Sequence, residues 1–181
     1  MRRCDWIGSD EELKYHDNEW GKPVYDDYIL FEFLILEGMQ AGLSWNTVLK
    51  KRESMRKAFD NFNPNKLIKY DDKKINMLMK NPEIIRHRLK LESLRQNAIC
   101  FLKIQREYGS FSLYIWSFTN RKTIVNNIKS KKDMPVVSVE AIEMSKALKK
   151  AGFKFVGPTI CYAYMQAVGL VNDHINTCEF K

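Results

Sequence analysis

Four residues with metal-binding side chains lie in two pairs at opposite ends of the sequence. Cys4 and His16 lie near the start, and His174 and Cys178 lie four residues apart near the finish. Zinc favours four nitrogen and thiolate ligands in a tetrahedron, and two cysteines with two histidines form a common structural set. Residues four apart share one face of a helix, so we expect His174 and Cys178 to point the same way. Either pair alone is weak support for a site, but together they predict a structural zinc ion that joins the two ends of one domain.

A carboxylate within an apolar helical stripe is the second feature with a chemical meaning. Leu30, Phe33, Leu34, Glu37 and Ala41 recur at helical spacing on one face. A buried carboxylate is costly unless it is paired or protonated, and burial without a cation raises its pKa. Glu37 therefore fits two roles at this point: a functional acid that recognises a ligand, or a structural glutamate that caps a loop or pairs with a buried arginine.

Aromatic residues accompany both features. Trp6, Tyr15 and Trp20 surround the N-terminal metal pair, and Trp45 follows Glu37 after a turn that contains glycine. Aromatic walls around one acid suit a flat, polar or cationic ring such as a nucleobase. The pattern thus favours a base-binding pocket with Glu37 at its bottom.

Helices must position these side chains, because the hydrophobic period is helical almost throughout. Capping residues, prolines and glycines mark the helix ends. We expect helices over residues 27–40, 45–59, 71–81, 84–108 and 138–150, a short helix after residue 63 and another from residue 158. Residues 119–137 show no helical period, and strand alternation is convincing nowhere. The sequence predicts an all-α fold.

Length and composition set the general class. With 181 residues and 45% hydrophobic content, the chain should form a single domain over residues 1–181. The four cysteines and the lack of a signal peptide indicate a reducing compartment, and we expect a monomer in the cytoplasm. The longest apolar stretch, residues 28–36, contains Glu32 and is too short to cross a membrane. The net charge of +8 favours a polyanionic partner, although lysine-rich surfaces also occur without one.

Four runs of sequence resemble DNA-3-methyladenine glycosylase I. They are YHDNEWG at residues 15–21, LEGMQAGLSW at 36–45, IIRHR at 84–88, and GFKFVG at 152–157 with the segment that follows to residue 174. The resemblance covers nearly the whole chain. It implies an all-helical helix-hairpin-helix fold, with that motif at about residues 139–169, and a structural zinc ion between the termini.

The resemblance also implies residue roles. The zinc ligands would be Cys4, His16, His174 and Cys178. Glu37 would recognise the methylated base and act in catalysis, and the pocket walls would be Tyr15, Trp45 and Trp6. Glycines and free amides at a helix N-terminus bind DNA phosphates without reading sequence. The expected DNA contacts are Gly152, Lys154, Gly157 and Thr159.

The sequence departs from what the family and its superfamily imply at positions that bear on the chemistry. A second tyrosine is expected three residues before Tyr15, where this chain has Glu12. An aspartate that assists base departure in the superfamily is replaced by Asn172, and Asp173 is shifted by one residue. Bifunctional relatives carry a Schiff-base lysine at the place of Thr159. The sequence therefore predicts a monofunctional enzyme without the usual catalytic aspartate.

The predicted reaction is hydrolysis of the N-glycosidic bond of 3-methyladenine in alkylated double-stranded DNA, on a base flipped out of the helix. This reaction starts base excision repair. The alternative is a non-enzymatic, zinc-stabilised DNA-binding module, which would leave Glu37 without a purpose. A zinc hydrolase is disfavoured, because four protein ligands leave no open position for water.

Overall fold

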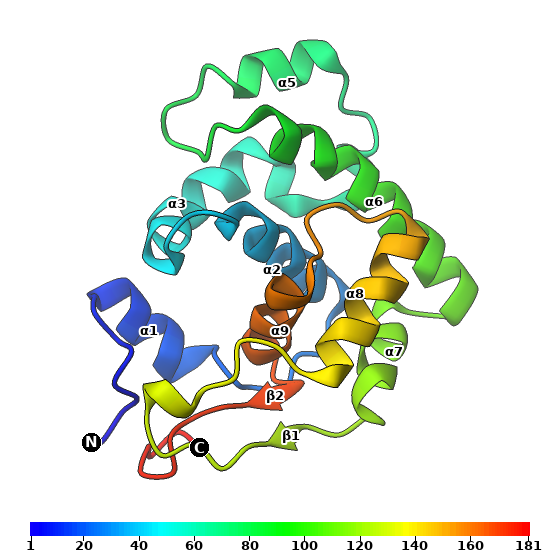
Figure 1. The fold of residues 1–181 in the computed structure, drawn as a ribbon. Helices are drawn as coiled ribbons and strands as arrows, with labels where there is room; N and C mark the ends of the chain where they lie inside the picture. Colours follow the sequence, from blue (N-terminus) through cyan, green and yellow to red (C-terminus); the bar gives the residue numbers. More distant parts are fainter.

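Helices form most of the structure, a computed structural model that describes residues 1–181 (Figure 1). The α-helices are α1 (Asp10–Asn18), α2 (Asp27–Gln40), α3 (Trp45–Ala58), α4 (Pro64–Leu67), α5 (Asp72–Leu78), α6 (Arg88–Tyr108), α7 (Phe111–Trp116), α8 (Val139–Ala151) and α9 (Pro158–Ala167). The short 3-10 helices are η1 (Asp60–Phe62), η2 (Ser117–Thr119) and η3 (Lys131–Asp133). The strands are β1 (Ile124–Val125) and β2 (Val171–Asn172). The prediction of an all-α fold is confirmed in that helices form most of the chain, and the two short strands depart from it.

Side-chain caps explain why several helices begin where the sequence predicts. The Asp26 carboxylate accepts hydrogen bonds from two amides at the start of α2. Ser44 and Ser138 accept from amides in the first turns of α3 and α8 in the same way. Such caps satisfy amides that have no partner within the helix. The helix predicted over residues 84–108 begins only at Arg88, because His87 adopts an extended backbone and caps α6 instead.

Two short parallel strands, β1 and β2, were not predicted. β1 pairs with β2 in the register Ile124 to Val171, and an isolated bridge joins Ile128 to Ile175. The segment after β2 continues as turns without a helix. The prediction that His174 and Cys178 share one helical face is therefore wrong, because pairing with the β1 segment takes the backbone groups that a helix would use.

Helix α2 occupies the middle of the fold and packs against α3, α6, α7 and α9 (Figure 1). Nine of its residues are buried, including Glu37. Its apolar side chains belong to one continuous core cluster of 46 buried residues. Helices α8 and α9 lie side by side and are joined by a short loop that reaches toward α6. None of the helices combines the length and the apolar character that a membrane crossing requires.

Candidate functional site

An aromatic pocket of about 480 Å³ lies at the C-terminal half of α2. The four residues predicted to hold a base all line it: Glu37, Tyr15, Trp45 and Trp6. Glu12, which stands where a second tyrosine was expected, also lines it, as do three polar or charged residues that the sequence did not single out: Gln40, Lys131 and Gln166. The structure thus brings the predicted residues together from α1, α2, α3 and the segment before α1.

The aromatic walls stand in contact with one another. The ring centroids of Tyr15 and Trp45 are 5.3 Å apart, and those of Trp6 and Trp20 are 5.0 Å apart. Contacts between α1 and α3 hold Tyr15 against Trp45, the first residue of α3. The indole Nε1 atoms of Trp6 and Trp45 are buried without a hydrogen-bond partner. Since buried donors are nearly always satisfied in proteins, two free donors in one pocket indicate a site for a ligand.

Glu37 is buried without a cation. Its side chain is 2% exposed, and its Oε2 has no hydrogen-bond partner. Arg52, the one buried arginine, is instead bound to Glu19 and Glu32 at 2.7 Å each. Burial raises the pKa of Glu37 to about 8, so the carboxyl is mostly protonated at neutral pH in the empty pocket. Glu37 is therefore not a structural glutamate that pairs with a buried arginine.

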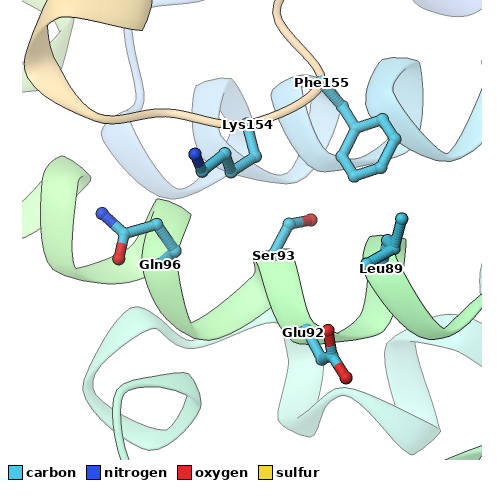
Figure 2. Close-up of a pocket in the computed structure, with 6 residues that line it drawn as sticks. All are labelled: Leu89, Glu92, Ser93, Gln96, Lys154 and Phe155. Atoms are coloured by element: carbon cyan, nitrogen blue, oxygen red, sulfur yellow. The ribbon is translucent and has the colours of Figure 1, made fainter.

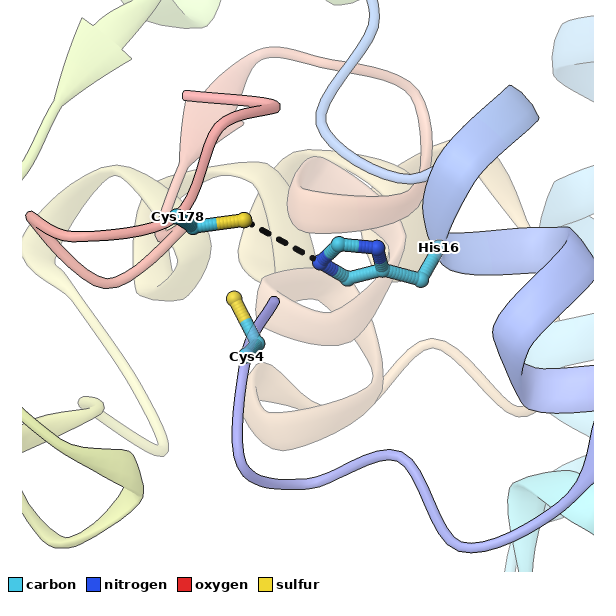
Figure 3. Close-up of side chains that lie close together, drawn as sticks. All are labelled: Cys4, His16 and Cys178. Atoms are coloured by element: carbon cyan, nitrogen blue, oxygen red, sulfur yellow. Dashed lines mark hydrogen bonds between the residues drawn. The ribbon is translucent and has the colours of Figure 1, made fainter. Parts of the chain in front are cut away.

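Cys4, His16 and Cys178 form a buried cluster that can hold a metal ion. Their ligand atoms lie within 4.8 Å of one another, and Cys178 Sγ lies 3.5 Å from His16 Nε2. In Figure 3 the three side chains point toward one another from the N-terminal segment, α1 and the C-terminal segment. The two ends of the chain thus meet at this cluster, as the spacing of the residues predicts.

His174 lies against this cluster with one ring nitrogen free. Its ring centroid is 4.9 Å from that of His16, and the side chain is 1% exposed. The Asn172 amide oxygen accepts from both the backbone amide and Nδ1 of His174 (3.1 and 2.8 Å), so Nδ1 carries the proton. Nε2 then carries a lone pair, and this atom is buried without a hydrogen-bond partner.

His16 is held in the same tautomer, because its Nδ1 donates to the Asp17 carboxylate at 2.8 Å. Arg3 donates to Asp17 and lowers the pKa of that carboxyl to about 2, which keeps it charged. In this tautomer the neutral ring of each histidine carries its proton on Nδ1 and a lone pair on Nε2, which is the form that binds a metal. The donor set fits a zinc ion, and the orphaned Nε2 of His174 is the observation that supports this.

Neither Asn172, which replaces the expected aspartate, nor its acidic neighbour Asp173 lines the pocket. Asn172 is bound to His174, as described above. Asp173 is fully buried, and its carboxylate accepts from Tyr162, Gln166 and Asn126 at 2.7–2.8 Å. The sequence-based expectation that Asp173 points elsewhere agrees with this geometry. Gln166 was missed by sequence reasoning, because no local signal in the sequence places it at the pocket that it lines.

The loop between α8 and α9 carries the expected DNA contacts. Gly152 ends α8 with a φ of +100°, and Gly157 caps α9 ahead of Pro158, with Thr159 in the first turn. Asn97 of α6 pins the loop, because it accepts from the amide of Lys154 (2.8 Å) and donates to its carbonyl (3.2 Å). The Lys154 side chain lies over α6 in a separate cavity, opposite Ser93 and Gln96 (Figure 2). It does not line the aromatic pocket.

The loop touches α2 directly beside Glu37. A side chain at Gly38 would approach Cβ of Phe155 to 3.2 Å, so a glycine allows this close contact. Phe155 itself has a φ of +58°, which is uncommon for a residue with a side chain. The hairpin that is expected to meet DNA therefore rests on the turn of helix that carries the buried carboxylate.

Comparison with known proteins gives one family for the whole of this arrangement. The family model for methyladenine glycosylase matches residues 6–181. The chain belongs to the methyladenine glycosylase family. Within it, the DNA-3-methyladenine glycosylase of Haemophilus influenzae is 49% identical over 180 residues, which are 99% of this chain and 97% of that protein. DNA-3-methyladenine glycosylase 1 of Escherichia coli is 45% identical over 179 residues, 98% of this chain and 96% of that protein.

Solved structures of family members share the fold. A crystal structure of 3-methyladenine DNA glycosylase I aligns with a TM-score of 0.96 at 45% identity and covers 98% of both chains. The Staphylococcus aureus enzyme, described in terms of how it recognises 3-methyladenine, aligns with a TM-score of 0.96 at 40% identity. That match covers 100% of this chain and 97% of the other. The methyladenine glycosylase fold therefore extends over the full length of the sequence.

Proposed function

We propose that this chain is a monofunctional DNA glycosylase that hydrolyses the N-glycosidic bond of 3-methyladenine in alkylated double-stranded DNA and so starts base excision repair. The observation that carries the proposal is the buried, unpaired carboxyl of Glu37 at the bottom of an aromatic pocket. Membership of the methyladenine glycosylase family and the described recognition of 3-methyladenine by the Staphylococcus aureus relative support it.

The pocket suits a methylated base because of its charge. Alkylation at N3 gives the adenine of the nucleotide a positive charge, whereas normal adenine is neutral. Tyr15 and Trp45 offer aromatic faces that attract a cation, an effect worth about 2 kcal/mol when water is excluded. Glu37 opposes the positive charge and bonds the purine's N6/N7 edge, which relieves the cost of burying an unpaired carboxyl. Normal adenine is neutral, so it gains neither the attraction to the aromatic faces nor the attraction to the Glu37 carboxylate.

The charge also explains how the bond breaks without a strong general acid. The bond between C1′ and N9 breaks with its electron pair going to N9, which neutralises the purine. A positively charged base is therefore a good leaving group. Water then adds to C1′ and loses a proton. Asp173 takes no part, because its carboxylate is enclosed by three hydrogen-bond donors.

We propose that α8, residues 152–157 and α9 act as the helix-hairpin-helix that binds DNA. The N-terminus of α9 carries amides that lack partners within the helix, and Gly157 has open space around the position of a side chain. Lys149, Lys150 and Lys154 place positive charge around this end. Gly152, Gly157 and Thr159 then contact phosphates rather than bases.

We also propose one structural zinc ion per chain, held by Cys4, His16, His174 and Cys178. The support is the buried cluster of three of these residues and the free Nε2 of the fourth. When bound, zinc would stabilise the joint between the N- and C-terminal segments. Four protein ligands leave it no open position, so the reaction does not pass through the metal.

Release of the free base tests the function. The chain is incubated with duplex DNA methylated at adenine N3, and the released bases are separated by chromatography. We expect 3-methyladenine from the parent protein, much slower release from Glu37→Gln, and no adenine from unmethylated duplex. Tight DNA binding without release of any base would support the alternative, a non-enzymatic DNA-binding module.

A further inference from the structure

We propose that Glu12 is a second catalytic carboxylate of the aromatic pocket, which faces the deoxyribose while Glu37 faces the base. Glu12 would oppose the positive charge that forms on the sugar and accept the proton of the attacking water. This inference rests on the proposed glycosylase function and assigns a role that Glu37 and Asp173 cannot fill.

Glu12 lies in the same cavity as Glu37 but nearer to solvent. It is partly exposed, whereas Glu37 is 2% exposed. Glu12 precedes Tyr15 by three residues on α1, so the two side chains lie on one face of that helix. Glu12 and Glu37 are the only carboxylates that line the pocket. In the proposed arrangement, a base that reaches the buried Glu37 leaves its sugar nearer the opening of the pocket, where the more exposed Glu12 lies.

One oxygen of Glu12 is free for this role. Its Oε2 accepts from the amide of Gly8 at 2.8 Å, just ahead of the N-cap residue of α1. Oε1 takes part in no hydrogen bond or salt bridge with the protein. Ser9 accepts from the backbone amide of Glu12 at 3.2 Å, which fixes the start of the helix. The carboxylate is thus anchored by one oxygen, and its other oxygen has no partner in the protein.

The chemistry needs a negative charge at the sugar, because the positive charge moves during the reaction. When the bond from C1′ to N9 breaks, its electron pair stays on N9, and the purine becomes neutral. The positive charge passes to C1′ and the ring oxygen of the sugar, away from Glu37. A water oxygen then forms a bond to C1′, and one of its protons passes to the Glu12 carboxylate and on to solvent. Placing an anion where charge develops is an effective way for a protein to lower a barrier.

The variant Glu12→Gln separates this role from helix capping. The amide oxygen of glutamine can still accept from Gly8, but the residue has no charge and cannot take a proton. We expect single-turnover release of 3-methyladenine from methylated duplex to slow at least tenfold. Affinity for DNA should be unchanged or higher, since one negative charge is removed. The matched control is Glu11→Gln, which removes the same charge from the neighbouring residue outside the pocket and should excise at the parental rate.

Chemical rescue adds a readout that a purely structural role would not give. In Glu12→Ala, added formate should restore part of the excision rate in proportion to its concentration, and it should not speed the parent enzyme. Excision by Glu12→Gln within twofold of the parent would overturn the proposal. So would slow excision with a lowered melting temperature and no response to formate, because Glu12 would then serve only as a helix cap. If the parent itself released no 3-methyladenine, the proposed function would fail, and the two failures are distinguishable.

Discussion

The ammonium group of Lys90 donates a hydrogen bond of 2.6 Å to the carbonyl oxygen of Ala41. It also donates to the carbonyl of Met39 at 2.9 Å. These carbonyls lie at the C-terminal end of α2, where no further helical amides are available. Lys90 is 5% exposed, and burial lowers its pKa. A residue of α6 thus holds the end of the helix that carries Glu37 and the turn that leads to Trp45.

Replacing Lys90 should therefore loosen the pocket as well as the fold. In Lys90→Met the two carbonyls lose a charged partner, and we expect unfolding free energy to fall by about 1–3 kcal/mol. Binding of free 3-methyladenine should weaken, because Trp45 is no longer held in place. Urea unfolding and base titration measure the two effects. The control is Lys103→Met on the exposed side of the same helix; equal behaviour of the two variants would remove Lys90 from this role.

The protonation of Glu37 should make stability depend on pH in a defined direction. Its pKa is about 8 in the folded protein, against 4.5 for an ordinary glutamate. The folded state therefore holds the proton more tightly than the unfolded state. This contribution is full below pH 4.5 and is lost as pH rises toward and through 8. At about 1.4 kcal/mol for each tenfold difference in proton affinity, the loss is roughly 5 kcal/mol at most.

Comparing the parent with Glu37→Gln isolates this contribution, because other ionisable groups act in both proteins. Urea unfolding at pH 5, 7 and 9 should show a smaller decline in the variant. At pH 9 the variant should be the more stable of the two. Parallel stability curves would mean that Glu37 has a cation partner or reaches water.

Trp45 should report base binding by fluorescence. Free 3-methyladenine that stacks on its ring should quench part of the tryptophan emission of the parent protein. Trp45→Phe should lose most of that quench and bind less tightly, since it also lacks the free Nε1 donor. Trp116→Phe is the control, because Trp116 is buried away from the pocket and donates to the carbonyl of Val24. A quench that survives in Trp45→Phe would make Trp6 the stacking residue.

Zinc should copurify with the protein at one ion per chain, as elemental analysis can measure. Cys178→Ala should lose the metal and lower the melting temperature together. Cys161→Ala removes another buried thiol outside the cluster and should keep the metal. An unchanged melting temperature and full activity in metal-free protein would contradict a structural role for zinc.

The enzyme should leave the DNA backbone intact. A lysine amine that attacks C1′ forms an imine, which borohydride traps as a covalent adduct. The hydroxyl of Thr159 cannot form one, and Lys154 lies in the cavity over α6 outside the aromatic pocket. We expect no trapped adduct and an uncut product strand until it is heated in alkali. An adduct that disappears in Lys154→Ala would show that the lysine reaches the sugar.

Local signals predict the helical part of this fold well. Asp26, Ser44 and Ser138 mark helix starts because capping is a local interaction of a side chain with amides two or three residues later. The position of Glu37 within an apolar stripe also predicts its burial. The end of α5 at Leu78 and the start of α6 at Arg88 differ from the predicted boundaries, since the intervening residues adopt turns and extended backbone that apolar period alone does not reveal.

The pairing of the two short strands was beyond prediction from the sequence. The strands β1 and β2 have two residues each and pair across 47 positions of chain, so neither carries a period of its own. The bonds of Asp173 and the place of Gln166 in the pocket depend on how α9 meets this strand pair.

The cluster of Cys4, His16 and Cys178 could be predicted from residue types alone, because thiols and imidazoles are recognisable as potential metal ligands without knowing the backbone. The helical spacing predicted for His174 and Cys178 was wrong. Cys4, His16 and Cys178 still meet, and His174 packs beside them against the His16 ring.

The proton on Glu37 has a consequence for how the enzyme searches undamaged DNA. Normal DNA is a polyanion. An ionised carboxylate at the bottom of the pocket would repel its phosphates each time the enzyme met an undamaged site. With a pKa of about 8, Glu37 is mostly neutral while the pocket is empty. A methylated adenine brings its own positive charge, which takes the place of the departing proton. Binding of the damaged base thus favours the ionised form of Glu37, which attracts that base. With intact DNA, the Glu37 carboxyl stays protonated and neutral.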